Sequence, residues 1–242
     1  MKTCLIKQNA GIGDIFLCQK IAKTIQEKTE YKNIIWPVLS QFFWIKDYLI
    51  DENINYVDEA LDFPYKNFYE TSSIKPFKTE DILYIPLHQT SLFIEGEVME
   101  TKFKLLNLTS EKWQDFFTFK RNYDKENSLY YEKLKLQDNS EFILRNRMYS
   151  TKEYNGNIKH EMKFSKNLPI VDLEYIDGYT LFDWCKVFEK AYEIHSVNTS
   201  INFILEKLQT TDQLFMYKRP EEDINQYINE EYLFNKKYIR FL

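Results

Sequence analysis

The feature that most constrains the fold is an alternation of short apolar strands with helical stretches along most of the chain. Its first instance is a strand at residues 2–7 (KTCLIK), a glycine turn, and apolar residues spaced three to four apart over residues 14–28. The further expected strands cover residues 33–39, 54–61, 81–87, 141–147, 168–174, 192–198 and 213–219, and the further expected helices include 42–50, 180–191 and 199–208. Such alternation is typical of parallel sheets joined by crossover helices. The sequence therefore predicts an α/β protein.

The strand–helix alternation runs through two halves of the chain, separated by the highly charged stretch FKRNYDKENSLYYEKLKLQDN at 119–139. A chain of 242 residues is long enough for two small domains. We place the boundary within residues 120–138 and take residues 1–125 and 126–242 as the two domains. Residues 62–80 are expected as an extended loop, and the tail from residue 221 as one or two terminal helices.

Composition excludes several classes of protein. A formal net charge of −5 without a basic stripe argues against a dedicated nucleic-acid binder. The three cysteines, Cys4, Cys18 and Cys185, have neither a metal-binding nor a disulfide spacing. No signal peptide or apolar run of about 18 residues is present, so we expect a cytoplasmic protein without a transmembrane segment. Peripheral attachment to a membrane stays open.

The glycine turn is the first candidate for function, because ligands of open α/β sheets bind beyond the carboxyl ends of the strands. Gly11 and Gly13 are two of only five glycines, and Asp14 follows them directly. A dinucleotide or P-loop fingerprint needs GxGxxG or GK[ST], and Phe16 stands where the third glycine belongs. Asp14 therefore either caps the following helix, worth about 1 kcal/mol, or is a carboxylate held at a reacting centre.

A second candidate follows the strand at 192–198. Ser196, Asn198, Thr199 and Ser200 lie where a helix begins. Hydroxyl groups and free N–H groups at such a position can bind a diphosphate. Ordinary capping by Asn198 or Thr199 is the alternative.

Basic residues follow the strand at 141–147, where Arg145, Arg147 and Lys152 lie at or beyond its end. Arginine presents a planar fork suited to phosphate oxygens. A solvated pair of arginines on an edge strand is the alternative.

Three more polar residues follow expected strands. Glu174 is positioned to accept hydrogen bonds from ribose hydroxyls, or is a solvated loop acid. His88 and Gln89 follow the strand at 81–87 and could line an acceptor pocket, although a lone histidine there is more often structural. The histidines have no metal-ligand spacing, so we expect no metal site.

Taken in order, these motifs resemble those of two-domain GT-B glycosyltransferases, and most closely the ADP-heptose:lipopolysaccharide heptosyltransferase family. The strand–GIGD–helix segment is similar to the loop that starts the acceptor domain of that family. The segment TLFDWCKVFEKAYEIHSVNTSINFILEKL resembles the donor-domain stretch, in which a strand ends in a small polar turn before a helix. Asn198 stands where that family usually has an aspartate.

The resemblance implies two Rossmann-like domains that face a cleft, and metal-independent, inverting transfer of a hexosyl or heptosyl group. The co-substrate would be a nucleotide-diphosphate sugar, with no other cofactor, and the partner a glycan or glycoconjugate acceptor. Asp14 would be the general base on the acceptor side, where Gly11, Gly13, His88 and Gln89 form the surrounding loops. The donor contacts would be Arg145, Arg147, Lys152, Glu174, Ser196, Asn198, Thr199 and Ser200.

Two other functions stay open. A degenerate, non-catalytic relative would bind a nucleotide or glycan without turnover. A small phosphotransferase or nucleotide-dependent ligase would show metal-dependent activity with ATP, although the missing GK[ST] motif counts against it.

Overall fold

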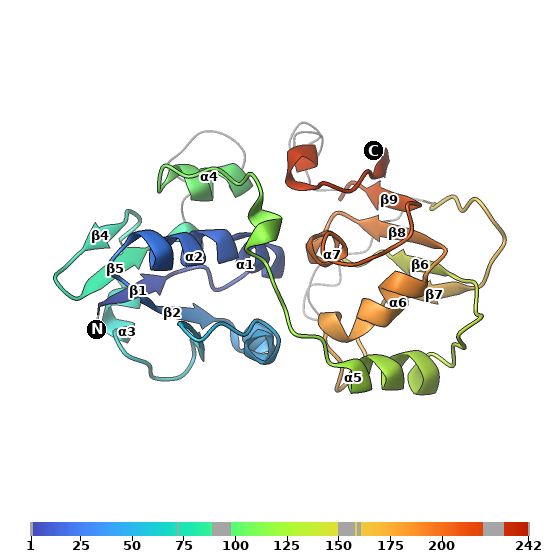
Figure 1. The fold of residues 1–242 in the computed structure, drawn as a ribbon, viewed down its shortest axis with the longest axis horizontal. Coiled ribbons are helices and arrows are strands. Elements are labelled where there is room, and N and C mark those ends of the chain that lie inside the picture. Colours follow the sequence, from blue (N-terminus) through green and yellow to red (C-terminus); the bar gives the residue numbers. More distant parts are fainter. Residues whose placement is uncertain are drawn as a thin grey trace. The chain divides into compact units, whose positions relative to one another are not determined.

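The computed structural model describes residues 2–71, 73–88, 98–149, 158, 161–219 and 230–241. The chain divides into two compact units, Met1–Lys120 and Arg121–Leu242 (Figure 1). The predicted boundary at 125/126 lies a few residues later, inside helix α5 (Tyr123–Asn127). The Arg121 guanidinium bonds Glu126 and, at 2.7 Å, Glu189, which ties the chain from residue 121 onward to the second unit.

The first unit is built on a five-stranded sheet in the order β3-β2-β1-β5-β4. Its strands are β1 (Thr3–Ile6), β2 (Asn33–Val38), β3 (Ile54–Asp58), β4 (Phe77–Lys78) and β5 (Ile82–Ile85). All neighbours are parallel except β4, which is an antiparallel edge strand. The four predicted strands are confirmed. The loop expected at 62–80 is wrong in part, because it contains β4 and the short helix α3 (Lys66–Tyr69).

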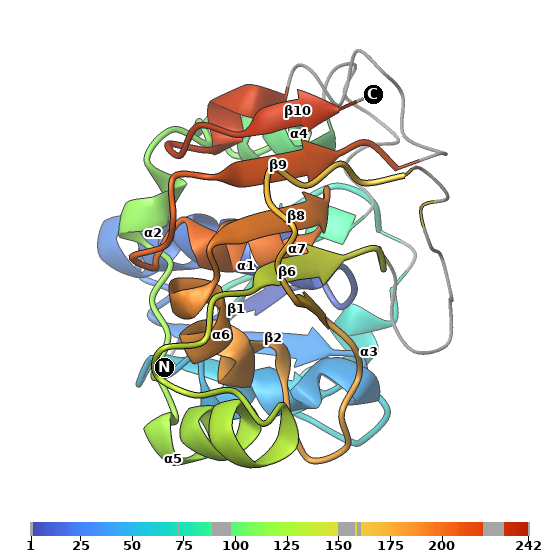
Figure 2. The same cartoon turned by 90° about the vertical axis from the view of Figure 1, so that its right-hand side faces the viewer.

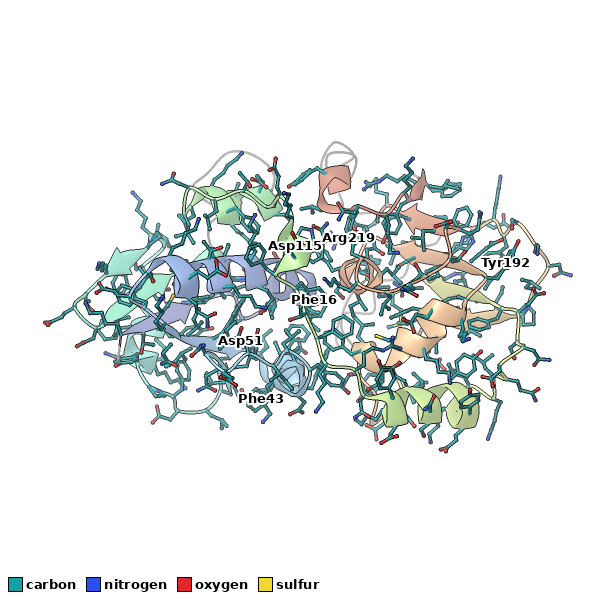
Figure 3. All side chains as sticks on the ribbon, viewed as in Figure 1. Phe16, Phe43, Asp51, Asp115, Tyr192 and Arg219 are labelled. Carbon is teal, nitrogen blue, oxygen red and sulfur yellow. The ribbon has the colours of Figure 1, made fainter. Side chains whose placement is uncertain are left out.

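The helices of the first unit differ in detail from the predicted ones. They are α1 (Ile12–Leu17), α2 (Gln19–Lys28), the 3₁₀ helix η1 (Ser40–Asp47), α3, α4 (Val98–Lys104) and the 3₁₀ helix η3 (Trp113–Asp115). The single helix expected at 14–28 is divided at Cys18. Phe16, labelled in Figure 3, stacks on Phe117 with ring centroids 4.7 Å apart. This stack packs α1 against the chain that follows η3.

The second unit contains another five-stranded sheet, in the order β10-β9-β8-β6-β7 (Figure 2). Its strands are β6 (Ile143–Asn146), β7 (Ile170–Asp172), β8 (Glu193–Val197), β9 (Leu214–Tyr217) and β10 (Ile239–Phe241). All four neighbouring pairs are parallel. The α/β class predicted for both halves is confirmed.

The prediction that the tail is only helical is wrong. After a 3₁₀ helix, η6 (Glu230–Leu233), the chain forms β10 at the edge of the sheet. Phe241 of β10 pairs in register with Tyr217 of β9, and their rings stack 4.9 Å apart. This stacked aromatic pair helps to stabilise the short edge strand.

The remaining helical segments of the second unit are α5, the π-helix η4 (Ser128–Lys133), the 3₁₀ helix η5 (Leu181–Trp184), α6 (Cys185–Lys190) and α7 (Ser200–Leu205). One apolar cluster joins Ile158 and Met162 to Val197, Phe215 and Tyr217 of the sheet. Within the described part of the chain, no helix has the length and apolarity needed to cross a membrane.

Candidate functional site

Gly11 ends the loop after β1 in a conformation that suits glycine. Its φ is +75°, in the left-handed region, and it occupies the N-cap position of α1. Asp14 is the third residue of that helix, so the expectation that Asp14 itself is the capping residue is wrong. A Cβ placed on Gly11 would lie 2.2 Å from Oδ2 of Asp14. The glycine therefore leaves the space that the Asp14 carboxylate occupies.

Gly13 has a different position. It is the second residue of α1 and is buried. Among the described glycines, only Gly11 and Gly178 have positive φ. Of the two glycines in the turn, Gly11 is thus the one whose conformational freedom the fold uses.

The Asp14 carboxylate forms an ion pair that the sequence did not predict. Its Oδ1 lies 3.2 Å from Nζ of Lys102, on α4. The Lys102 side chain is only 5% exposed, whereas that of Asp14 is 22% exposed. Lys102 Nζ also donates to Gln8 Oε1 at 2.8 Å and to the Leu87 carbonyl at 3.1 Å. The carboxylate is thus held from the protein side and remains accessible to solvent.

His88 lies just beyond β5 and is exposed, with its backbone N–H donating to the Lys7 carbonyl at 2.8 Å. Desolvation lowers the pKa of its imidazole, and the Lys102 ammonium lowers it further, while Asp14 acts in the opposite direction. His88 therefore belongs to the same electrostatic neighbourhood as Asp14. Gln89, the other residue predicted here, lies outside the described residues.

A second cluster of polar side chains lies beyond the carboxyl ends of β1 and β3. Asn9 Nδ2 donates to Glu59 Oε2 at 2.6 Å, and the Tyr69 hydroxyl donates to the same oxygen at 2.7 Å. Lys7 Nζ donates to the Tyr69 carbonyl at 2.9 Å. Asn9 Oδ1 is buried and accepts no hydrogen bond from the described residues. No sequence motif marked these residues, because their meeting depends on the strand order.

In the second unit, the residues of the predicted turn between β8 and α7 differ in burial and in hydrogen bonding. Ser196 is buried, accepts a hydrogen bond from Asn146 Nδ2 at 3.1 Å and donates to the Val197 carbonyl at 2.8 Å. Its hydroxyl group is therefore engaged in hydrogen bonds within the sheet and is not available to a ligand in this conformation. Asn198 is also buried, and its backbone N–H donates to the Tyr217 carbonyl at 2.9 Å.

Thr199 and Ser200 begin α7 as predicted. Thr199 occupies the N-cap position, but its side chain makes no capping hydrogen bond. Its Oγ1 is buried and has no hydrogen-bond partner among the described residues. Ser200 is the first helical residue and is partly exposed. These two residues remain candidates for contacting an anionic group.

The two predicted arginines differ. Arg145 forms a bidentate pair with Asp172 of β7, with Nε–Oδ1 and Nη2–Oδ2 distances of 2.6 and 2.7 Å. These hydrogen bonds raise the pKa of Arg145 and occupy its fork. Arg145 is thus paired with an acid of β7, and the alternative of a solvated pair of arginines on an edge strand is wrong, because β6 lies between β8 and β7. Arg147 is partly exposed, and its Nε is buried with no hydrogen-bond partner in the part of the chain that the structure describes.

The remaining donor predictions add little. Glu174 is exposed beyond β7. Lys152 lies outside the described residues. The sequence also missed Asn202 of α7. Its side-chain amide is buried, and neither its nitrogen nor its oxygen has a hydrogen-bond partner among the residues that the structure describes.

His195 of β8 is part of a buried network, not of a solvent-facing site. Its Nε2 lies 2.8 Å from Glu193 Oε2, and its Nδ1 lies 2.9 Å from the Tyr217 hydroxyl. Burial lowers the pKa of His195, although Glu193 acts in the opposite direction. Burial opposes ionisation of Glu193, but hydrogen bonds from Ser165 and His195 outweigh it and lower the pKa of Glu193. We assign this network to the packing of the sheet.

Comparisons with known proteins identify the fold. No protein-family model and no curated protein sequence matches the chain. Among solved structures, the chain is similar to the glycosyl transferase family 9 protein from Veillonella parvula DSM 2008, with a TM-score of 0.53 and 8% sequence identity. The match covers 99% of this chain and 86% of that one. The two α/β units of the chain therefore have a GT-B-like glycosyltransferase fold.

Proposed function

We propose that the protein is a metal-independent, inverting glycosyltransferase that moves a hexosyl or heptosyl group from a nucleotide-diphosphate sugar to a hydroxyl group of a glycan or glycoconjugate. The observation that carries the proposal is the Asp14 carboxylate, which lies beyond the carboxyl end of β1, is paired with Lys102 and occupies the space left by Gly11. Ligands of α/β sheets bind at this edge. The likeness in fold to a family 9 glycosyl transferase over nearly the whole chain supports the same class of reaction.

In the proposed reaction, Asp14 is the general base. Its carboxylate takes the proton of the acceptor hydroxyl while the hydroxyl oxygen attacks the anomeric carbon of the donor. The bond between that carbon and the phosphate oxygen breaks, and the nucleoside diphosphate leaves with the bonding electrons. A single displacement inverts the anomeric centre. The 22% exposure of Asp14 is compatible with access by an acceptor.

The leaving diphosphate needs compensation for its charge, and the second unit offers groups for this role. The donor contacts that we favour are Arg147 Nε, Thr199 Oγ1 and the start of α7 at Ser200. The first two atoms are buried and have no hydrogen-bond partner among the described residues. Fixed donors aimed at developing charge stabilise a transition state without reorganisation. Arg145 would join them only by leaving Asp172.

The test has two stages. A thermal-shift screen of nucleoside diphosphates identifies the donor class, because a ligand that binds the folded state raises the melting temperature with its concentration. Transfer is then measured with the matching nucleotide sugars, with and without EDTA. We expect Asp14→Asn to lower kcat by about 10²–10⁴-fold. The control is Asp115→Asn, the same change at an exposed position of the same unit (labelled in Figure 3).

A non-catalytic binding protein is the second candidate. Two observations favour it, namely the neutralisation of Arg145 by Asp172 and the burial of Ser196, each of which removes an expected donor contact. Binding of a nucleoside diphosphate without transfer or donor hydrolysis would support this candidate. Turnover that Asp14→Asn abolishes and Asp115→Asn preserves would exclude it.

A further inference from the structure

We infer that Lys102 is a positioning residue that orients the Asp14 carboxylate for proton transfer without touching the substrate. This inference rests on the proposed role of Asp14 as base. Lys102 comes from α4, a helix to which the sequence assigned no role in the site.

The position of the Lys102 ammonium does not depend on Asp14. A lysine has three N–H donors, and two of those on Lys102 are taken by the Gln8 side chain and the Leu87 carbonyl, at 2.8 and 3.1 Å. Gln8 follows β1 and Leu87 follows β5, so both acceptors are carried by neighbouring central strands. The Gln8 carbonyl in turn accepts a hydrogen bond from Trp36 Nε1 at 2.8 Å. The same ammonium lies 3.2 Å from Asp14 Oδ1, with which it forms an ion pair.

The orientation of Asp14 follows from this anchor. Oδ1 is paired with Lys102 at 3.2 Å, and Oδ2 lies in the space that a Cβ on Gly11 would enter. Oδ2 has no hydrogen-bond partner among the described residues. One carboxylate oxygen is thus held while the other is left to accept a proton.

Burial explains why Lys102 acts through Asp14. At 5% exposure its side chain is almost fully covered by protein, whereas the Asp14 side chain is 22% exposed. A buried ammonium is costly unless it is paired, and Asp14 is its acidic partner among the described residues. Without Lys102, the carboxylate loses its anchor and rotates freely. A displacement of about 1 Å of a catalytic group costs roughly 10²-fold in rate.

The test is a double-mutant cycle in the transfer reaction. We expect Lys102→Met to lower kcat about 10²-fold, with KM for the acceptor unchanged within about twofold. In an Asp14→Asn background, Lys102→Met should have no further effect, because the group it positions is absent. The control is Lys104→Met, the same change at an exposed position of α4. A Lys102→Met effect that is as large without Asp14, or no effect at all, would overturn the inference.

Two further measurements cover misfolding and failure of the proposed function. Lys102→Arg keeps the buried charge and should retain more activity than Lys102→Met; equal loss in two variants with wild-type melting temperatures would contradict the inference. If the wild-type protein transfers no sugar, a cycle of urea unfolding midpoints still tests the pair. Non-additive midpoint shifts for Asp14→Asn and Lys102→Met support the anchor, and additive shifts refute it whatever the reaction.

Discussion

Replacing Gly11 with alanine should damage catalysis more than its effect on stability would suggest. With φ at +75°, the site costs an L-residue about 1–2 kcal/mol. The added Cβ would also lie 2.2 Å from Asp14 Oδ2 and 3.1 Å from Asp14 Cγ. Because a carboxylate is the movable end of its side chain, it would give way by about 1 Å to restore normal contact. We expect Gly11→Ala to lower kcat by roughly 10²-fold.

A second glycine separates the two effects. Gly178 has a φ of +82°, but a Cβ added there would meet no atom within 4 Å. Gly178→Ala therefore carries the same backbone strain without moving a catalytic group. Both variants are compared by urea unfolding and by kcat with the donor found in the screen. Our reasoning is refuted if the two variants lose equal stability and both keep the wild-type kcat.

Three further predictions concern the second unit and the core of the first unit. Burial lowers the pKa of His195, so the unfolded state takes up a proton at a higher pH than the folded state. This residue therefore makes the free energy of unfolding fall as pH drops below about 6.5, by at most about 1.4 kcal/mol per pH unit. Urea unfolding between pH 7.5 and 5 should show that the unfolding free energy of His195→Gln depends less steeply on pH. Calorimetric titration with a nucleoside diphosphate should show that Arg147→Ala weakens binding at least fivefold, whereas Arg145→Ala changes the dissociation constant less than twofold. Phe117→Ala removes a fully buried ring stacked on Phe16 and should lower the free energy of unfolding by about 3–5 kcal/mol. Phe117→Leu keeps an apolar side chain but not the stack, so an unchanged urea unfolding midpoint for this variant would contradict a stabilising role of the stacking.

The pattern of the sequence predicted most strands because strand formation in this chain follows local apolar runs. It failed where tertiary contacts decide. The edge strand β10 forms through pairing of Phe241 with Tyr217, and a local reading of the tail favoured helix. The helix at 14–28 is divided at Cys18, a break that its apolar spacing did not reveal.

By itself, the sequence determined the α/β class, the two halves and the place of Gly11 and Asp14 after the first strand, since these depend on residue order and local periodicity. The tertiary structure decided what those residues meet. Lys102 reaches Asp14 only because α4 packs beside the ends of β1 and β5, and no local pattern distinguishes this lysine from its exposed neighbours. Likewise, Arg145 is bound by Asp172 because β6 and β7 are adjacent in register. Contacts between residues distant in sequence are set by strand order and helix packing, which a single sequence does not display.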